Sequence, residues 1–301
     1  MSLTVPLQRE PVPLTEDQAM RYLRTTLVPG IGRAGQERLL AARVLVVGAG
    51  GLGSPVLLYL AAAGVGHVTV ADTDVVDATN LQRQIVHGRA SVGVAKTTSA
   101  AHRIADLNAD VTVRERGFLT AADVDGEVAG HDLVVECSDT FDTKFLIADA
   151  CARAGVPLVW GTIVGTTYQV GAFWSAPPPG FPTTTLRHLY PAAPPAGSTP
   201  SSADIGVLGA ACGQAGSAMA SEAIKLITGC GEPLLGRILI ADVAAARWNT
   251  VEYVAARGQA RTQAASGAHP TGEAYTPDGA MPDDDLLETS TDNRTRAERQ
   301  P

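Results

Sequence analysis

Side chains that could contact a nucleotide triphosphate crowd the segment Asp72–Gln84, which holds three carboxylates, several amides and an arginine within thirteen positions. An arginine can neutralise phosphate charge, while carboxylates and amides can hold ribose hydroxyls and a metal ion. A dinucleotide cofactor such as NAD needs one ribose contact, so this density favours a triphosphate over hydride transfer. The candidate ligands in this segment are Asp72, Asp74, Asn80, Gln82 and Arg83.

The elements before this segment are those that would position it. An apolar run, Val44–Val47, predicts a strand, a helical pattern follows to about Gly64, and Val68–Ala71 predicts a second strand that ends at Asp72. In such a unit the glycines allow a tight turn, close approach of a phosphate and close packing of helix on strand. The acid about twenty residues on is placed to bind a ribose hydroxyl. A tight turn without a ligand is the alternative, but strand, helix and acid in register favour nucleotide binding through Gly48, Gly50, Gly51 and Gly53.

Two phrases of this region, GAGGLGSPVLLYLAAAGVG and NLQRQ, resemble the ThiF/MoeB/HesA family, the bacterial relatives of ubiquitin-activating enzymes, and read most like the MoeB type. The resemblance covers roughly residues 17–255. It implies an adenylyltransferase that uses ATP and Mg²⁺. It assigns Arg83 and Lys96 to the phosphates, Asp72 to the ribose, and Asn80 and Gln82 to the nucleotide and the reacting centre.

Lys96 lies near the start of a helix expected over Ser91–Leu107. A positive charge there opposes the helix dipole, which suggests another purpose such as a phosphate contact. An exposed lysine that aids solubility is the alternative. Val92–Lys96 also resembles the family's D-V-G-x-x-K.

Arg21 begins the segment Arg21–Thr25, which resembles the family's R-Y-x-R-H except that Thr25 replaces the histidine. The resemblance implies a homodimer in which Arg21 reaches the active site of the other subunit. The alternative is a solvated charged face on the helix expected over Thr15–Leu27.

Asp139 follows an apolar strand expected over Asp132–Cys137 and precedes a helix expected over Thr143–Ala154. Open α/β sheets bind ligands just beyond the carboxyl ends of their strands. Asp139 resembles the family's magnesium-binding aspartate, and we expect Ser138 or Asp142 to provide the helix N-cap instead.

The expected architecture is α/β, a Rossmann-like doubly wound sheet of the ThiF/MoeB type, extended by a second set of strands and a crossover loop. We expect a flexible N-terminus over residues 1–14, an ATP-binding adenylation domain over 15–256 and a disordered acidic tail over 257–301. The crossover loop, about residues 176–204, is rich in Pro, Thr, Ser and Gly and has no periodicity. The additional strands are expected at Val156–Trp160, Thr167–Trp174, Arg237–Asp242 and Trp248–Val254.

Besides Thr25, the chain departs from the family at three places. Most relatives hold a structural zinc with two C-x-x-C pairs, a spacing suited to tetrahedral zinc. Thr185 and His188 occupy the first pair here and no cysteine follows Cys230, so we expect no zinc site. Ser202 stands where thioester-forming relatives carry a cysteine, and a plain loop serine is the favoured interpretation. Near Asp139, the family's asparagine and arginine are replaced by Thr140 and Lys144.

Composition limits the classes of function. The 301 residues carry a net charge of −8. The stretch Glu273–Pro301 has eight acids and three arginines, and neither it nor the body suggests nucleic-acid binding. No run approaches the roughly 18 apolar residues of a membrane span, and Met1–Glu10 lacks the features of a secretory signal. Four isolated cysteines in apolar segments indicate reduced thiols of a cytoplasmic protein: Cys137, Cys151, Cys212 and Cys230.

The sequence therefore predicts adenylation of a carboxylate, with release of pyrophosphate. The resemblance implies as partner a ubiquitin-like sulfur carrier with a C-terminal Gly-Gly, as in molybdopterin or thiamine synthesis. A first alternative is adenylation of a peptide or small acid in a natural-product pathway, which would use the same ATP residues. A second is a non-catalytic nucleotide-binding scaffold, weakened because Arg21, Arg83, Lys96 and Asp139 occur together.

Overall fold

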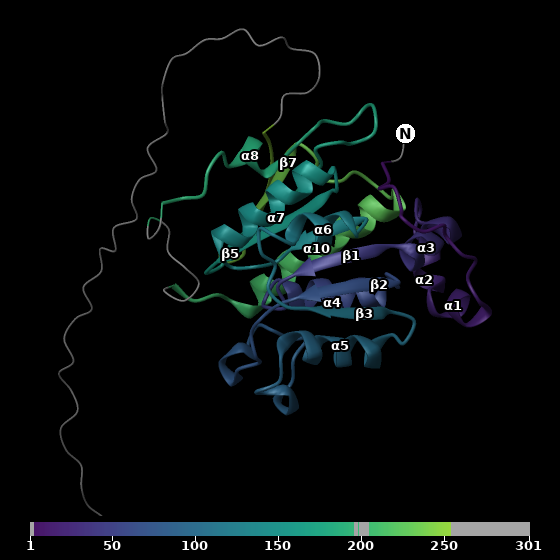
Figure 1. Cartoon of the computed structure of the whole chain (residues 1–301), viewed down its shortest axis with the longest axis horizontal. Helices are drawn as coiled ribbons and strands as arrows, with labels where there is room; N and C mark the ends of the chain where they lie inside the picture. Colours follow the sequence, from purple (N-terminus) through teal and green to yellow (C-terminus); the bar gives the residue numbers. More distant parts are fainter. Residues whose placement is uncertain (1–2, 196–197, 199–204, 254–301) are drawn as a thin grey trace, which may run out of the picture. The chain divides into compact units, whose positions relative to one another are not determined.

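A single mixed sheet organises the part of the chain that the computed structural model describes, residues 3–195, 198 and 205–253. Its strand order is β3-β2-β1-β4-β5-β6-β7-β8 (Figure 1). The strands are β1 (Arg43–Val47), β2 (His67–Ala71), β3 (Thr112–Arg116), β4 (Leu133–Glu136), β5 (Leu158–Val164), β6 (Thr167–Phe173), β7 (Arg237–Asp242) and β8 (Arg247–Glu252).

The sheet has a parallel half and an antiparallel half. Strands β3, β2, β1, β4 and β5 pair in parallel, whereas β6, β7 and β8 continue the sheet antiparallel to their neighbours. Strand β4 is buried throughout, as expected for a central parallel strand covered on both faces. The order reverses between β1 and β4, and open sheets of this kind bind ligands at such a switch point. The predicted fold class, with its second set of strands, is confirmed.

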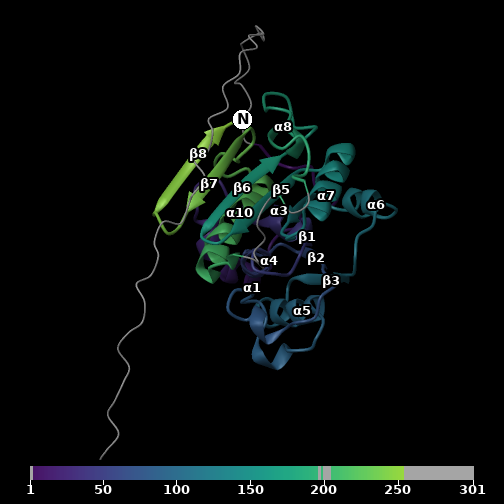
Figure 2. The same ribbon diagram turned by 90° about the vertical axis from the view of Figure 1, so that its left-hand side faces the viewer.

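Helices cover both faces of the sheet (Figure 2). The larger core lies between the sheet and a layer that includes α3, α4, α5 and α10, and a second core lies under α6, α7 and α8 on the other face. The helices are α1 (Glu16–Arg21), α2 (Leu23–Thr26), α3 (Gly32–Ala41), α4 (Gly53–Ala62), α5 (Lys96–Leu107), α6 (Val124–Ala129), α7 (Phe141–Ala154), α8 (Leu186–Leu189) and α10 (Gly209–Thr228), with short 3₁₀ turns η1 (Ala78–Asn80) and η2 (Arg89–Ser91).

Helix ends follow local chemistry, with two corrections to the sequence expectations. Thr15 caps α1 in a capping box, and Gly229 ends α10 in the left-handed conformation. The helix expected from Ser91 begins only at Lys96, because Gly93 takes a positive φ of 85° between η2 and α5. The N-cap of α7 is Thr140, whose hydroxyl accepts the Thr143 N–H, and neither expected residue takes that place.

The N-terminal segment lies against the body from residue 3 onward. Leu3 and Val5 are buried, and the Val5 N–H donates to the Leu226 carbonyl at 2.9 Å. These apolar contacts explain why a segment expected to be flexible is held. The whole tail expected at 257–301, and Ser202 in the crossover loop, fall outside the described residues. Among those described, no helix is long and apolar enough to span a bilayer.

Candidate nucleotide-binding site

The glycine turn after β1 is shaped by close backbone approach. Gly48 has a φ of 94°, and a Cβ there would lie 2.9 Å from the Cys137 carbonyl carbon and oxygen. A Cβ on Gly53, the first residue of α4, would lie 1.9 Å from the Gly48 carbonyl oxygen. At Gly50 a Cβ would meet only the Gln84 side chain, at 3.7 Å. Gly48 and Gly53 therefore permit the tight turn and the close packing, and Gly50 leaves room beside the backbone.

Asp72 holds the turn to the segment that follows β2. Its Oδ2 accepts the Ala49 N–H at 2.7 Å, and its Oδ1 accepts the Asp74 N–H at 2.9 Å. Each carboxylate oxygen can accept more than one hydrogen bond, so a ribose hydroxyl could still be bound. The acid expected to bind ribose thus also orders the glycine turn.

Lys96 and Asp74 form an ion pair at the start of α5, with Nζ 2.7 Å from Oδ2. The lysine side chain is only 7% exposed, whereas that of Asp74 is 66% exposed. The Lys96 N–H also donates to the Asp74 carbonyl, at 2.9 Å. Because an ammonium group has three donors, Lys96 can keep Asp74 and still reach a phosphate.

Arg83 lies over the glycine turn. A Cβ added at Gly51 would be 3.5 Å from Arg83 Cγ and 2.9 Å from Cys212 Sγ. Arg83 Nη1 donates to the Thr79 carbonyl at 3.4 Å. This contact leaves most guanidinium donors available for phosphate oxygens.

Asn80 and Gln82 differ in how they are held. The Asn80 Oδ1 accepts the Asp77 N–H at 3.2 Å, within the capping box of η1. The Gln82 side chain is exposed. Asn80 is therefore fixed by local structure, whereas Gln82 is open to solvent.

Asp139 is exposed in the turn between β4 and α7. Cys137, two residues earlier, has its carbonyl against Gly48, so this turn adjoins the glycine turn. The carboxylate is available to a metal ion or a phosphate-bound cation.

A buried ion pair beneath this turn was not found from the sequence. Lys144 Nζ donates to Glu136 Oε2 at 2.8 Å and to the Gly161 carbonyl at 2.7 Å, and both side chains are almost fully buried. Glu136 Oε1 accepts the Ser138 N–H at 2.7 Å. The pair therefore connects α7 and β5 to the turn that carries Asp139. The available signal was an acid ending an apolar strand and a lysine on an otherwise apolar helix face.

His87 is a second residue that sequence reasoning missed. Its Nε2 lies 2.9 Å from the Ala49 carbonyl and its Nδ1 lies 2.9 Å from Ser99 Oγ. Burial lowers the pKa of His87, so the ring is neutral near pH 7. A neutral ring has one N–H, so Nε2–H donates to the carbonyl and Nδ1 accepts from the Ser99 hydroxyl. His87 thus joins the glycine turn to the helix that begins at Lys96.

Arg21 lies away from the other predicted site residues of its own chain. It ends α1, and its Nη1 donates to the Leu107 carbonyl at 3.4 Å, with Nε 4.0 Å from Asp110 Oδ2. Figure 1 shows α1 and α2 beside α3, at the end of the sheet where β1 begins. The neighbouring Arg24 is exposed and has no ion pair among the described residues.

The residues at the family's zinc-ligand positions and the cysteines form no metal site among the described residues. In the described ranges no cluster of three or more His, Cys, Asp or Glu side chains could hold a metal ion. Thr185 and His188 instead form the capping box of α8. Burial raises the pKa of the Cys212 thiol to about 11, against the opposing effect of Arg83. Its thiolate is therefore scarce at neutral pH.

The glycine turn, the acid after β2 and the groups beyond β4 define an α/β nucleotide-binding protein. A family model described as "ThiF family" matches residues 22–262, and the chain belongs to that family. The family predicted from the sequence is therefore confirmed.

Relatives with high identity extend this assignment. The chain is 45% identical over 253 residues to "Probable adenylyltransferase/sulfurtransferase MoeZ" of Mycobacterium tuberculosis, covering 83% of this chain and 64% of MoeZ. It is 43% identical to "SAMP-activating enzyme E1" of Haloferax volcanii, covering 80% of this chain and 87% of that protein. It is 42% identical to "Sulfur carrier protein adenylyltransferase" of Thermus thermophilus, covering 76% and 84%.

Solved structures share the fold. Escherichia coli MccB matches with a TM-score of 0.68 at 22% identity, covering 83% of this chain and 75% of MccB. PaaA matches with a TM-score of 0.67 at 20% identity, covering 82% and 76%. At this identity the likeness concerns the fold alone.

Proposed function

We propose that the chain is an adenylyltransferase that activates a carboxylate with ATP. The observation that carries the proposal is that a ThiF family member keeps the glycine turn, Arg83 and Lys96 together with Asp139 beyond the neighbouring strand. The substrate carboxylate oxygen attacks the α-phosphorus of ATP, and the bond to pyrophosphate breaks. The products are acyl-AMP and pyrophosphate. We propose that residues 15–256 form the adenylation domain.

Positioning and charge neutralisation carry such a transfer. Gly48–Gly53 and the start of α4 provide backbone N–H groups for phosphate oxygens. Arg83 and Lys96 neutralise phosphate charge, Asp72 binds the ribose, and Asn80, Gln82 and Asp74 complete the nucleotide contacts. Asp139 would hold Mg²⁺, which when bound neutralises the phosphate oxygens. The exposed carboxylate beside the glycine turn fits this role.

The substrate we propose is the C-terminal Gly-Gly of a small ubiquitin-like sulfur carrier. Support comes from the names of relatives at 42–45% identity, which refer to sulfurtransferase, SAMP-activating and sulfur-carrier functions. The described cysteines are free, and we place the protein in the cytoplasm. Pyrophosphate exchange into ATP should require ATP, Mg²⁺ and the carrier, and should vanish when the carrier lacks its last glycine. Equal exchange with and without that glycine would contradict this substrate.

We also propose a homodimer in which each subunit lends Arg21 to the other site. The position of Arg21 away from its own chain's glycine turn supports donation between subunits. An Arg21→Ala subunit mixed with an Asp139→Asn subunit should regain exchange at one of the two sites. Arg24→Ala is the matched comparison. If Arg24→Ala abolishes exchange and Arg21→Ala does not, the role assigned to Arg21 is wrong.

A further inference from the structure

A cavity of about 230 Å³ lies at the amino ends of the first strands, at the opposite end of the parallel strands from the glycine turn. Arg43, His67 and Thr112 begin β1, β2 and β3 and are register partners across the sheet. Two residues further along, Thr69 and Arg114 are partners on the same face. Two rows of polar side chains thus form the cavity floor.

Side chains from two other segments close the cavity. His131, just before β4, and Arg9, in the N-terminal segment, also line it. Arg9 Nη1 lies 2.6 Å from His67 Nε2. The guanidinium must donate, so the His67 ring accepts at Nε2. Burial, followed by the charges of Arg9 and Arg43, lowers the pKa of His67 and keeps this ring neutral.

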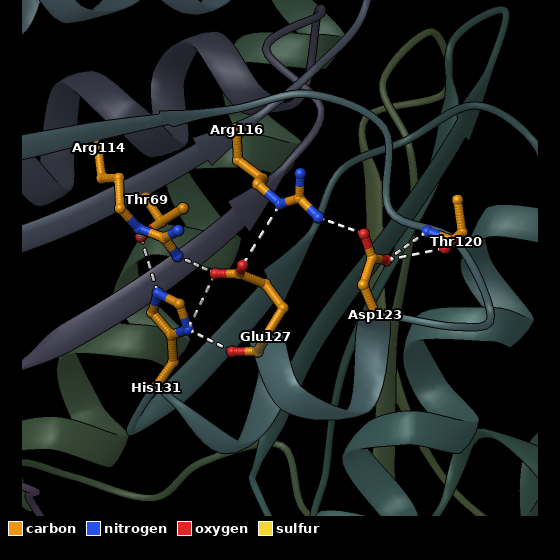
Figure 3. Close-up of polar contacts among 7 residues, drawn as sticks. All are labelled: Thr69, Arg114, Arg116, Thr120, Asp123, Glu127 and His131. Atoms are coloured by element: carbon orange, nitrogen blue, oxygen red, sulfur yellow. Dashed lines mark hydrogen bonds and ion pairs between the residues drawn. The ribbon is translucent and has the colours of Figure 1, made fainter.

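One wall is a fixed polar network, shown in Figure 3. Arg114 pairs with Glu127, and its Nε donates to Thr69 Oγ1 at 3.3 Å. His131 Nδ1 lies 2.7 Å from the Glu127 carbonyl, and its Nε2 lies 2.8 Å from Thr69 Oγ1. Arg116 holds the second oxygen of Glu127 at 3.4 Å. Both oxygens of the Glu127 carboxylate are therefore paired with arginines of this wall, Arg114 and Arg116.

The opposite side of the cavity carries two arginines, Arg9 and Arg43, that are not paired with a carboxylate among the described residues. Arg9 and Arg43 form no ion pair within the described residues. The nearby carboxylate, Asp132, already accepts the Gln8 N–H at 2.6 Å and the Arg43 N–H at 2.7 Å. Two guanidinium groups thus face a cavity whose acids have other partners.

We propose that this cavity is a binding site for a small phosphate-type oxyanion. Guanidinium groups match phosphate oxygens with paired N–H donors, and the Thr112 hydroxyl adds a further donor, since that of Thr69 is used by His131. The cavity is smaller than the roughly 300–1,000 Å³ of drug-sized ligand sites. It therefore suits inorganic phosphate or one phosphate group of an ester rather than a whole nucleotide. Bound anion would tie Arg9, and with it the N-terminal segment, to the sheet.

Calorimetric titration of the full chain with inorganic phosphate at constant ionic strength tests the proposal. We expect Arg9→Gln and Arg43→Gln each to weaken phosphate binding at least tenfold, and Arg43→Lys to weaken it less. Arg103→Gln, on the exposed surface of α5, is the control and should bind within about twofold of the parent. Thermal midpoints without phosphate verify that each variant folds. Phosphate bound at the glycine turn contributes equally to all four variants.

Amide hydrogen exchange shows where on the protein the phosphate binds. Phosphate should slow amide exchange over residues 3–10 in the parent and in Arg103→Gln, but not in Arg9→Gln. Binding unchanged in both Arg9→Gln and Arg43→Gln would overturn the proposal, as would no measurable binding in the parent. Neither outcome depends on adenylation, so failure here is distinct from failure of the proposed function.

Discussion

The two ends of the same parallel strands carry different kinds of positive charge. At the carboxyl ends, Lys96 is paired with Asp74, and Lys144 with Glu136. At the amino ends, Arg9 and Arg43 face a cavity without an ion pair among the described residues. The first arrangement fixes charges beside a backbone turn, and the second leaves guanidinium groups open. Charges fixed in ion pairs order the turns beside them, whereas guanidinium groups without an ion pair among the described residues, Arg83 included, keep donors for an anion.

The largest loss of stability is expected at the buried Lys144–Glu136 pair, at the carboxyl ends of the parallel strands. Lys144→Met removes the partner of Glu136 and leaves a buried carboxylate, which should lower the free energy of unfolding by about 3–5 kcal/mol. Urea denaturation measures this. The double variant Glu136→Gln with Lys144→Met should recover much of the loss. A single variant as stable as the parent would mean that the pair does not hold the Asp139 turn.

Asp139→Asn should reduce pyrophosphate exchange about a hundredfold or more while leaving stability unchanged. The side chain is exposed, so its loss removes charge at the reacting centre without removing packing. Asp142→Asn, an exposed acid on the first turn of α7, is the control and should retain exchange. Exchange within tenfold of the parent in Asp139→Asn would contradict the role assigned to this carboxylate.

His87 should make stability depend on pH. Its pKa is lowered from 6.5 by burial, so below pH 6.5 the unfolded chain takes up a proton that the folded ring refuses. The free energy of unfolding should therefore fall as the pH drops below 6.5, by at most about 1.4 kcal/mol per pH unit from this group. His87→Asn should show a shallower slope, whereas His102→Asn, exposed on α5, should keep the parent slope. Identical slopes would show that His87 is not buried beside the glycine turn.

The smallest effect is expected at Cys212. With a thiol pKa of about 11, it should form no adduct when enzyme, ATP and carrier are incubated. Intact mass with and without reductant should show unmodified enzyme in both. A reductant-sensitive adduct that disappears in Cys212→Ala would instead make this cysteine a nucleophile.

Local sequence signals predicted the fold and part of the site. Glycine spacing and apolar runs located β1, α4, β2 and Asp72, because those features are set by neighbours in the chain. Asp139 was likewise marked by its place after an apolar strand.

Contacts between distant segments could not be predicted in this way. The Glu136–Lys144 pair and the His87 link to Ala49 depend on how separate segments pack. The amino-end cavity gathers Arg9, Arg43 and Arg114 from three segments that carry no common motif. The start of α5 was misplaced because Gly93 breaks a pattern that otherwise reads as helical.

Isotope transfer tests the central claim most directly. A carrier whose C-terminal carboxylate is labelled with heavy oxygen is incubated with the enzyme, ATP and hydroxylamine. The carboxylate attacks the α-phosphorus and forms acyl-AMP. Hydroxylamine then attacks the acyl carbon and releases AMP, which should carry one heavy oxygen, whereas pyrophosphate should carry none. AMP without the label, or label in pyrophosphate, would contradict adenylation of the carboxylate.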